Sequence, residues 1–455
     1  MTIQMLTPYS LGRYTIPAGV VVGLFDAATE AGLIAAKQAI ATAAAANWIV
    51  PVDNPQPATL TEAQVEQTQA LVSGARNQSL ATAAGAFGLG ASANGSTSNQ
   101  TLIRQHQALG PYYGYRLVYA NKGIAQTITL AKAGGAATDQ QVSNTLGSVA
   151  SVTFGGATTV VEAAGSGAAA DGVPAFTLSD WIMQPSVART DFPTEQPLLQ
   201  TLTHYAGTYT QMLTSATMAT ELLAAPGYRV GGRQRPGDEV TTVSASQPLP
   251  AGTSLIPYGV QFLYEQTWTV VADIGDSRIR GQISSTTTTG YRSQAERVSA
   301  LARAAGLRWT PISTAVTGQG HDASYQTGLA LVTALQPTYL LIPALSVNDS
   351  MTAANMQASF ARCMALVEHC RRNNVTPVLL TVPPRDSYSG AELAILQAQN
   401  NRILALRGQL LVADFAGIVC DTTGYIAAAY DSGDGVHINE AGTAAGAAAV
   451  YAAMA

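Results

Sequence analysis

Strand-like and helix-like segments alternate from residue 267 to the end of the chain, and this alternation limits the possible folds more than any other feature. The strand-like segments are short apolar runs of the length of buried strands, at 268–274, 307–316, 338–346, 375–382 and 409–415. The helical patterns that follow them cover 291–305, 322–335, 352–373, 390–407 and 439–453. Such alternation with short connections predicts a parallel α/β sheet with helices on both faces.

Polar motifs follow three of these predicted strands. Gly275-Asp276-Ser277 follows the first strand, Ser346-Val347-Asn348-Asp349 follows the third, and Asp434-Gly435-Val436-His437 lies between the last strand and the last helix. The carboxyl ends of parallel strands lie along one edge of a sheet. We therefore expect these distant motifs to meet there.

The residue types in these motifs are those of a nucleophilic hydrolase. A serine hydroxyl needs an adjacent base, and we expect His437 to take the proton of Ser277. A carboxylate on the same loop would orient the imidazole, and both Asp434 and Asp431 lie close to the histidine in sequence.

A serine hydrolase also needs donors for the oxyanion. The expected donors are the side-chain amide of Asn348 and the backbone N–H groups of Ser277 and Gly318, with Gly320 as an alternative to Gly318. Asn348 has a second interpretation, because asparagine commonly stabilises the turn after a strand.

At this point the chain resembles the SGNH/GDSL hydrolase family over residues 267–455. The resemblance is carried by four blocks, Asp273–Ser277, Val316–Gly318, Ser346–Asp349 and Asp434–His437. It implies a flavodoxin-like three-layer α/β/α fold and ester hydrolysis through a serine acyl-enzyme, with no metal and no cofactor. The family spacing favours Asp434 over Asp431.

Two features depart from the family pattern. Ser346 stands where the family usually has glycine, which changes the freedom of the backbone but leaves the catalytic side chains in place. Arg278 and Arg280 stand near positions where the family often has an aliphatic residue or threonine. These arginines would put positive charge beside the serine and favour an acidic or sugar-bearing substrate.

The remaining histidines, cysteines and acids have structural interpretations. We expect His321 to lie at the surface or to cap a helix, with a place in the substrate cleft as the alternative, and Asp349 to cap the helix that follows it. His437 itself has an alternative role as a helix cap. Cys363 and Cys370 lie seven residues apart on one predicted helix, so they are expected to be buried on one face, and no disulfide framework or metal-ligand spacing is present in the sequence.

The chain before residue 267 divides into three predicted parts. Residues 109–266 contain short strand-like runs that predict a β-sandwich or jelly roll, with a helix or excursion at Gln211–Ala224. Residues 56–108 are predicted as a helical and low-complexity linker. Residues 1–55 form a small module, a β-like run at Tyr14–Phe25 and a helix at Ala27–Ala46, which resembles N-terminal modules of phage virion proteins.

Composition excludes several classes of function. Charged residues make up 11% of the 455 residues and no basic block exists, which argues against nucleic-acid binding. No signal peptide or membrane-spanning segment is expected. If the protein acts on a virion, we expect contacts with other virion proteins through the N-terminal module and possible homo-oligomers.

Three hypotheses follow from the sequence. The first is a serine esterase that removes acyl groups, most plausibly acetyl groups, from an acylated surface carbohydrate, located on the phage particle or otherwise extracellular. The second is a structural or glycan-binding virion protein with an inactive or vestigial hydrolase fold. The third is a lipase for long acyl chains, which would need an apolar lid that the sequence does not show.

Overall fold

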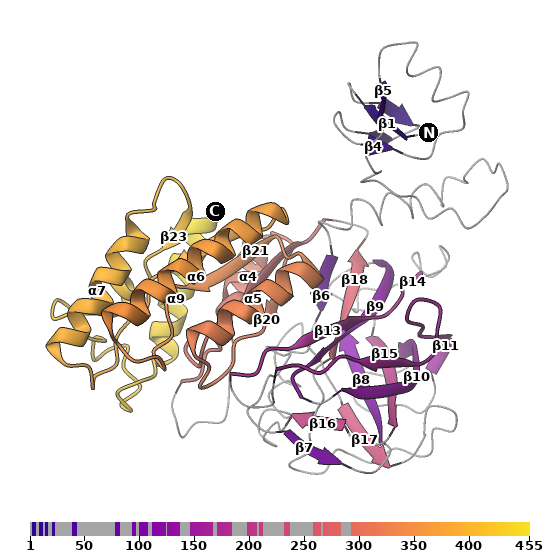
Figure 1. Ribbon diagram of the computed structural model, residues 1–455, viewed down its shortest axis with the longest axis horizontal. Helices are drawn as coiled ribbons and strands as arrows, with labels where there is room; N and C mark the ends of the chain where they lie inside the picture. Colours follow the sequence, from indigo (N-terminus) through magenta and orange to yellow (C-terminus); the bar gives the residue numbers. More distant parts are fainter. Residues whose placement is uncertain are drawn as a thin grey trace. The chain divides into compact units, whose positions relative to one another are not determined.

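The computed structural model forms two compact units, Met1–Ala75 and Arg76–Ala455. Residues 293–455 are described without interruption (Figure 1). Before them, side chains are described at 114–123, 125, 127–129, 151–166, 171–183, 201, 203–206, 259–264 and 267–283. Elsewhere only the strands named below are described.

The first unit contains two small antiparallel sheets. The order is β4-β1-β5 in one sheet, and β2 pairs with β3 in the other. The strands are β1 (Thr2–Met5), β2 (Tyr9–Leu11), β3 (Tyr14–Ile16), β4 (Val21–Val22) and β5 (Ala39–Thr42). β5 lies inside the range predicted as the helix Ala27–Ala46, so that prediction is wrong at 39–42.

The second unit begins with antiparallel strands. One sheet has the order β11-β10-β15-β8-β17 with β12 beside β10, a second has the order β13-β9-β18-β6 with β14 beside β9, and β16 pairs with β7. Their bounds are β6 (Gln78–Ala81), β7 (Ala93–Ser96), β8 (Gln100–Gln107), β9 (Tyr112–Asn121), β10 (Gln126–Ala136), β11 (Leu146–Ser151), β12 (Val160–Glu162), β13 (Ala175–Leu178), β14 (Ile182–Met183), β15 (Leu198–Ala206), β16 (Tyr209–Met212), β17 (Gly232–Pro236) and β18 (Tyr258–Tyr264).

This antiparallel region differs from the prediction at its start. β6, β7 and β8 lie in the segment predicted as a linker, where β8 pairs with β15 and β6 pairs with β18. Most of the range Gln211–Ala224 lies outside the described residues, as do residues 56–77 of the segment predicted as a helical and low-complexity linker. The β-sandwich over residues 109–266 stays a prediction.

The C-terminal part is a five-stranded parallel sheet, which confirms the predicted α/β fold. Its strand order is β20-β19-β21-β22-β23, and every neighbouring pair is parallel. Counted from the first strand of this part, the order is 2-1-3-4-5, the order of flavodoxin-like folds. The strands are β19 (Thr269–Asp273), β20 (Trp309–Ser313), β21 (Tyr339–Pro343), β22 (Thr376–Leu380) and β23 (Leu411–Ala413).

Helices cover both faces of this sheet (Figure 1). They are α4 (Gln294–Ala304), α5 (His321–Leu335), α6 (Ala353–Arg372), α7 (Gly390–Leu404), α8 (Phe415–Val419) and α9 (Glu440–Met454). The sequence predicted all of them except α8, a single short helix that begins where the last strand was expected to end.

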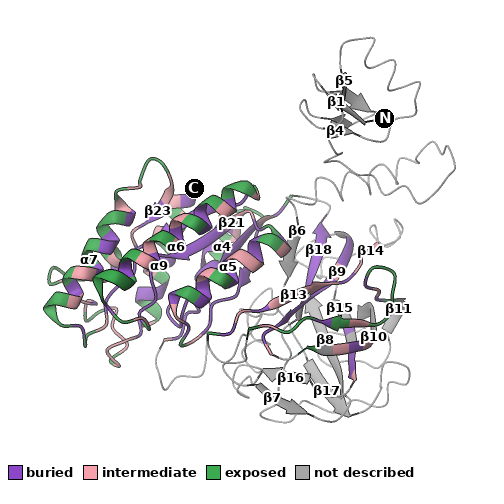
Figure 2. Cartoon of the chain, in the orientation of Figure 1, coloured by how far each residue is buried: buried purple, intermediate pink, exposed green. Residues whose placement is uncertain are grey.

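Alternating side chains of the strands explain why both faces are covered. Val270 and Ala272 of β19 belong to the core that includes α5, α6 and α7, whereas Val271 belongs to the core that includes α4 and α9. Strand side chains point alternately to the two faces, so the consecutive apolar residues Val270, Val271 and Ala272 require burial on both faces. Figure 2 shows the strands of this sheet as buried and the outer faces of the helices as exposed.

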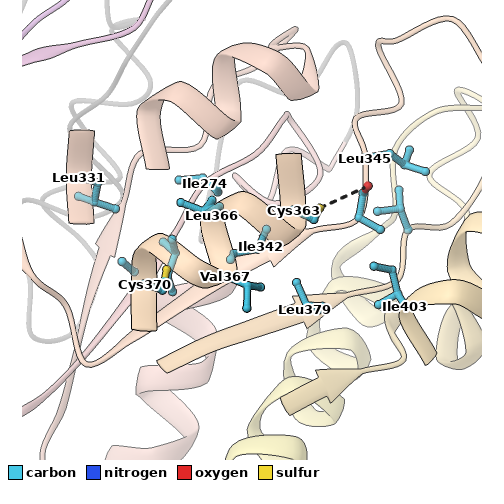
Figure 3. Close-up of a cluster of buried hydrophobic side chains, with 14 of the residues drawn as sticks. Ile274, Leu331, Ile342, Leu345, Cys363, Leu366, Val367, Cys370, Leu379 and Ile403 are labelled. Atoms are coloured by element: carbon cyan, nitrogen blue, oxygen red, sulfur yellow. Dashed lines mark hydrogen bonds between the residues drawn. The ribbon is translucent and has the colours of Figure 1, made fainter. Parts of the chain in front are cut away.

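The first of these cores also contains the two helical cysteines. Cys363 and Cys370 lie buried on α6 near Ile342 and Leu379 (Figure 3). The thiol of Cys363 contacts the carbonyl oxygen of Ala344 at 3.7 Å. Burial raises the pKa of both thiols to about 12, which keeps them protonated. Their role as small core residues is confirmed.

Helix ends define where the loops of the site begin. Ser293 and Glu296 form a capping box at α4, Thr352 caps α6, and Asn439 caps α9 by accepting the N–H of Gly442. The cap of α9 therefore lies two residues after His437. Within the described residues, no helix combines the length and apolar character needed to cross a membrane.

Candidate active site

The nucleophile loop begins where β19 ends. Gly275 has φ of +138°, and a Cβ atom there would lie 2.7 Å from Cγ1 of Ile279, so only glycine fits this turn. Ser277 follows in a tight turn closed by the N–H of Gln282 on its carbonyl oxygen at 2.9 Å. The turn places the hydroxyl at the carboxyl end of β19, next to β21, where the strand order of the sheet reverses.

Ser277, His437 and Asp434 lie in one hydrogen-bonded chain. Nε2 of His437 lies 3.0 Å from Oγ of Ser277, and Nδ1 lies 2.7 Å from Oδ2 of Asp434. Ser277 and His437 are 4% and 7% exposed, so both side chains are largely shielded from solvent. This arrangement allows the imidazole to accept a proton from the serine.

Asp434 is held by the loop that carries it. Its Oδ1 accepts the N–H groups of Val436 at 2.9 Å and His437 at 2.7 Å, and the hydroxyl of Ser432 at 2.9 Å. Oδ2 is thereby directed to the imidazole. The alternative carboxylate, Asp431, accepts the N–H of Gly433 at 3.0 Å. Of the two aspartates considered from the sequence, the structure brings Asp434 to the histidine.

Asn348 lies in the loop after β21, the strand that neighbours β19. Its Nδ2 donates to the carbonyl oxygen of Gln319 at 3.1 Å, which places the amide against the loop that contains Gly318. Gly318 has φ of +80°, in a turn closed by the N–H of Gln319 on Val316. The N–H of Gly320 donates to Oδ1 of Asp171 at 2.7 Å, so the amide of Gly320 is already engaged.

A buried network that sequence reasoning missed joins these loops. Oδ2 of Asp276 contacts the hydroxyl of Ser346 at 2.9 Å and the N–H of Val347 at 3.1 Å. The Ser346 hydroxyl also lies 2.7 Å from the carbonyl oxygen of Gln319 and accepts the N–H of Asn348. Ser346, the departure from glycine, thus links the three loops that carry Ser277, Gly318 and Asn348. Its position two residues before Asn348 was the only signal in the sequence.

The expectation for Arg278 and Arg280 is not supported by their environment. Both side chains are buried, at 3% and 7% exposure. The guanidinium of Arg278 donates to the backbone carbonyl oxygens of Val436, Pro383 and Pro384. The idea that Arg278 presents its charge to a substrate is therefore wrong, because its donors are used inside the protein.

Two further expectations are corrected. His321 is 2% exposed rather than at the surface, and its Nε2 lies 3.2 Å from the carbonyl oxygen of Pro343. Burial lowers the pKa of His321 to about 4. Asp349 does not cap α6 but accepts the N–H of His321 at the start of α5. Desolvation raises the pKa of Asp349.

No group of three or more histidine, cysteine, aspartate or glutamate side chains in the described part of the chain is arranged to hold a metal ion.

His437 is not a helix cap, since Asn439 occupies that position. His204 is buried and His369 contacts Thr333, whereas the side chain of His106 lies outside the described residues.

Solved structures similar to this chain include several hydrolases. They include a GDSL-like lipase from Bacteroides thetaiotaomicron VPI-5482, with 18% identity over 41% of this chain and 87% of its own, at a TM-score of 0.32. The psychrotrophic esterase EstA from Pseudoalteromonas sp. has 15% identity over 41% and 96%, also at 0.32. A family 3 carbohydrate esterase from Clostridium thermocellum has 14% identity over 41% and 94%, at 0.31.

No protein-family model and no curated protein sequence matches the chain. At identities this low, function has to be argued from the residues of the chain itself.

Proposed function

We propose that the protein is a serine esterase of the SGNH/GDSL type that hydrolyses small acyl esters. The observation that carries the proposal is the chain of hydrogen bonds from Ser277 through His437 to Asp434. Three residues from two loops 160 positions apart in sequence meet in the geometry that a serine acyl transfer requires.

The proposed reaction has two halves. The oxygen of Ser277 attacks the ester carbonyl carbon while Nε2 of His437 takes the hydroxyl proton, and Asp434 stabilises the imidazolium. The imidazolium then gives that proton to the departing alcohol, which leaves an acyl-serine. Water, deprotonated by His437, attacks the acyl-serine and releases the carboxylic acid and free Ser277.

The oxyanion that forms in each half needs donors. We assign the amide of Asn348, the N–H of Ser277 and the N–H of Gly318, because the N–H of Gly320 is occupied by Asp171. Loss of one such donor typically costs about 10²–10³-fold in rate.

The burial of the catalytic pair supports a short acyl group. Ser277 and His437 are 4% and 7% exposed, and a short acyl chain needs the least space beside a buried hydroxyl. We therefore propose acetyl as the acyl group and an acylated surface polysaccharide as the substrate, consistent with a polar surface of low charge. Attachment to a phage particle through residues 1–55 is part of the same proposal and rests on the sequence resemblance alone.

The test compares acyl chain lengths and a serine variant. Purified protein should hydrolyse p-nitrophenyl acetate faster than p-nitrophenyl octanoate and release acetate from an acetylated polysaccharide. Ser277→Ala should lower kcat by roughly 10⁴–10⁶-fold. Ser359→Ala, which changes a buried serine on α6, is the control. Equal rates for Ser277→Ala and the unaltered protein would eliminate the proposal, and proteomics of purified particles would test the virion location.

A further inference from the structure

The residue directly after the nucleophile is a buried cation. Arg278 is 3% exposed, and burial lowers its pKa to about 10, which leaves it charged at neutral pH. Burying a charge is costly unless it is hydrogen-bonded. Because little water reaches Arg278, hydrogen-bond acceptors of the protein must stabilise its charge.

Backbone carbonyl groups supply the acceptors. Nε of Arg278 donates to the oxygen of Val436 at 2.6 Å, and the two terminal nitrogens donate to the oxygens of Pro383 and Pro384, the second at 2.7 Å. Only a guanidinium presents donors in a fixed planar fork that reaches three such oxygens at once, whereas the ammonium of lysine is a compact point charge.

The three carbonyl groups belong to two loops of the candidate site. Val436 directly precedes His437, so one bond holds the loop of the base. Pro383 and Pro384 follow β22 and directly precede Arg385, which has a polar contact of its own. A terminal nitrogen of Arg385 donates to Oδ1 of Asn348 at 2.7 Å.

The contact with Arg385 fixes the orientation of the Asn348 amide. An arginine can only donate, so the amide atom that faces it must be the oxygen. The nitrogen then faces the carbonyl oxygen of Gln319, where it uses one N–H. An amide has two N–H groups, and the second remains for the oxyanion.

We infer that Arg278 is a positioning residue that holds the His437 loop and the Arg385 loop in place around Ser277. This inference rests on the proposed esterase function. Arg278 touches no reacting atom; it acts through Val436 on the base and, through the loop that carries Arg385, on the Asn348 amide. Displacing a catalytic group by about 1 Å can cost about 10²-fold in rate, so loss of the Arg278 hydrogen bonds should lower turnover.

The first experiment measures kcat and KM for p-nitrophenyl acetate with Arg278→Lys and Arg278→Ala. Lysine keeps the positive charge but lacks the planar set of guanidinium donors. We therefore expect kcat to fall about 10²-fold while KM changes less than about threefold. Arg303→Lys is the matched control. Arg303 also donates to a backbone carbonyl oxygen, that of Trp309 at 2.7 Å, but at the amino end of β20, the opposite edge of the sheet.

Chemical rescue separates positioning from general destabilisation. Arg278→Ala leaves a space lined by three carbonyl oxygens. Added methylguanidinium should fill this space and raise the kcat of Arg278→Ala about tenfold, whereas methylammonium should not. If Arg278→Ala does not fold, Arg278→Lys alone decides the question, with circular dichroism as the check on its fold.

The link to Asn348 has a separate readout. Arg385→Met should lower kcat about tenfold in the unaltered protein and by less than about twofold in an Asn348→Ala background, since the amide it orients is then gone. Arg278→Lys should still lower kcat in the Asn348→Ala background, because its bond to Val436 acts on His437.

The outcomes keep this inference apart from the proposed function. If Ser277→Ala is as active as the unaltered protein, the esterase mechanism fails. Another outcome is that Ser277→Ala is inactive while Arg278→Lys keeps kcat within twofold of the unaltered protein, or loses no more kcat than Arg303→Lys. Either result overturns only the positioning role of Arg278. Rescue by methylammonium as strong as by methylguanidinium would overturn it too.

Discussion

Replacement of Asp434 by asparagine is the sharpest test of the candidate site, because the loop dictates how the amide will sit. Oδ1 of Asp434 accepts two backbone N–H groups, from Val436 and His437. An amide turned with its NH₂ toward them would leave buried donors facing each other, at a cost of about 1–3 kcal/mol for each unsatisfied group. The amide oxygen will therefore occupy the Oδ1 position.

The NH₂ group must then face the imidazole. It can only donate, so Nδ1 of His437 has to be unprotonated and the ring proton moves to Nε2, which lies 3.0 Å from the Ser277 oxygen. A protonated Nε2 cannot accept the serine proton. The same change in a known serine protease lowers kcat by about 10⁴-fold, equivalent to roughly 5–6 kcal/mol of transition-state stabilisation, and we expect a similar loss.

The assay is the rate of p-nitrophenyl acetate hydrolysis by Asp434→Asn, with Asp431→Asn as the matched control on the same loop. Asp431→Asn should keep most of the activity, because its carboxylate accepts the N–H of Gly433 rather than the imidazole. The reasoning is refuted if Asp434→Asn keeps more than about one tenth of the activity, or if Asp431→Asn loses as much.

Three further predictions concern the support of the site and the stability of the fold. Ser346→Gly should lower kcat about tenfold, because it removes the hydroxyl that links Asp276, Gln319 and Asn348, and a hydrogen bond contributes about 1 kcal/mol. Gly275→Ala should lower the free energy of unfolding by about 1–3 kcal/mol in urea, since its φ of +138° disfavours a side chain. Asp273→Asn and His321→Gln should change the pH dependence of stability in opposite directions.

The pH dependence follows from burial of both groups. Burial raises the pKa of Asp273 to about 6, so the folded state binds more protons than the unfolded state between about pH 4 and 6, and stability falls as pH rises through that range. Burial lowers the pKa of His321 to about 4, so stability rises between about pH 4 and 6.5. Each effect is worth about 3 kcal/mol, and urea unfolding of each variant against pH would separate them.

Each of these predictions has a control or a contrary result. Ser359→Ala changes a buried hydroxyl on α6 and should leave kcat unchanged, and an equal loss from it would contradict the role of Ser346. Gly390→Ala, at the start of α7 with open space around it, should not destabilise. If the free energy of unfolding of Asp273→Asn varies with pH as it does in the unaltered protein, titration of Asp273 does not cause that pH dependence.

The sequence determined the α/β part of the fold because its evidence is local. Short, mainly apolar runs such as Val270–Ile274, rich in β-branched residues and ended by Gly275, predict buried strands, and the capping pair Ser293 and Glu296 marks a helix start within the chain itself. The antiparallel region was harder, since β6 and β8 pair with strands more than ninety residues away. Pairing at that distance leaves no periodic signal in a low-complexity segment rich in Gly, Ala, Ser and Asn, such as Ser79–Gln100.

The same division applies to the site. The sequence alone named Ser277, Asn348 and His437, with Asp434 favoured over Asp431 by the family spacing. Ser277 and Asn348 each follow a strand, His437 lies in the loop before the last helix, and a parallel sheet brings the loops at its carboxyl edge together. Only the tertiary structure showed that Asp434 contacts the imidazole, that the N–H of Gly320 is engaged by Asp171, and that Arg278 is buried with its donors on backbone carbonyl groups. Those outcomes depend on which backbone groups a side chain meets across the fold, and hydrogen bonds between loops are set by their positions in space rather than by their spacing along the chain.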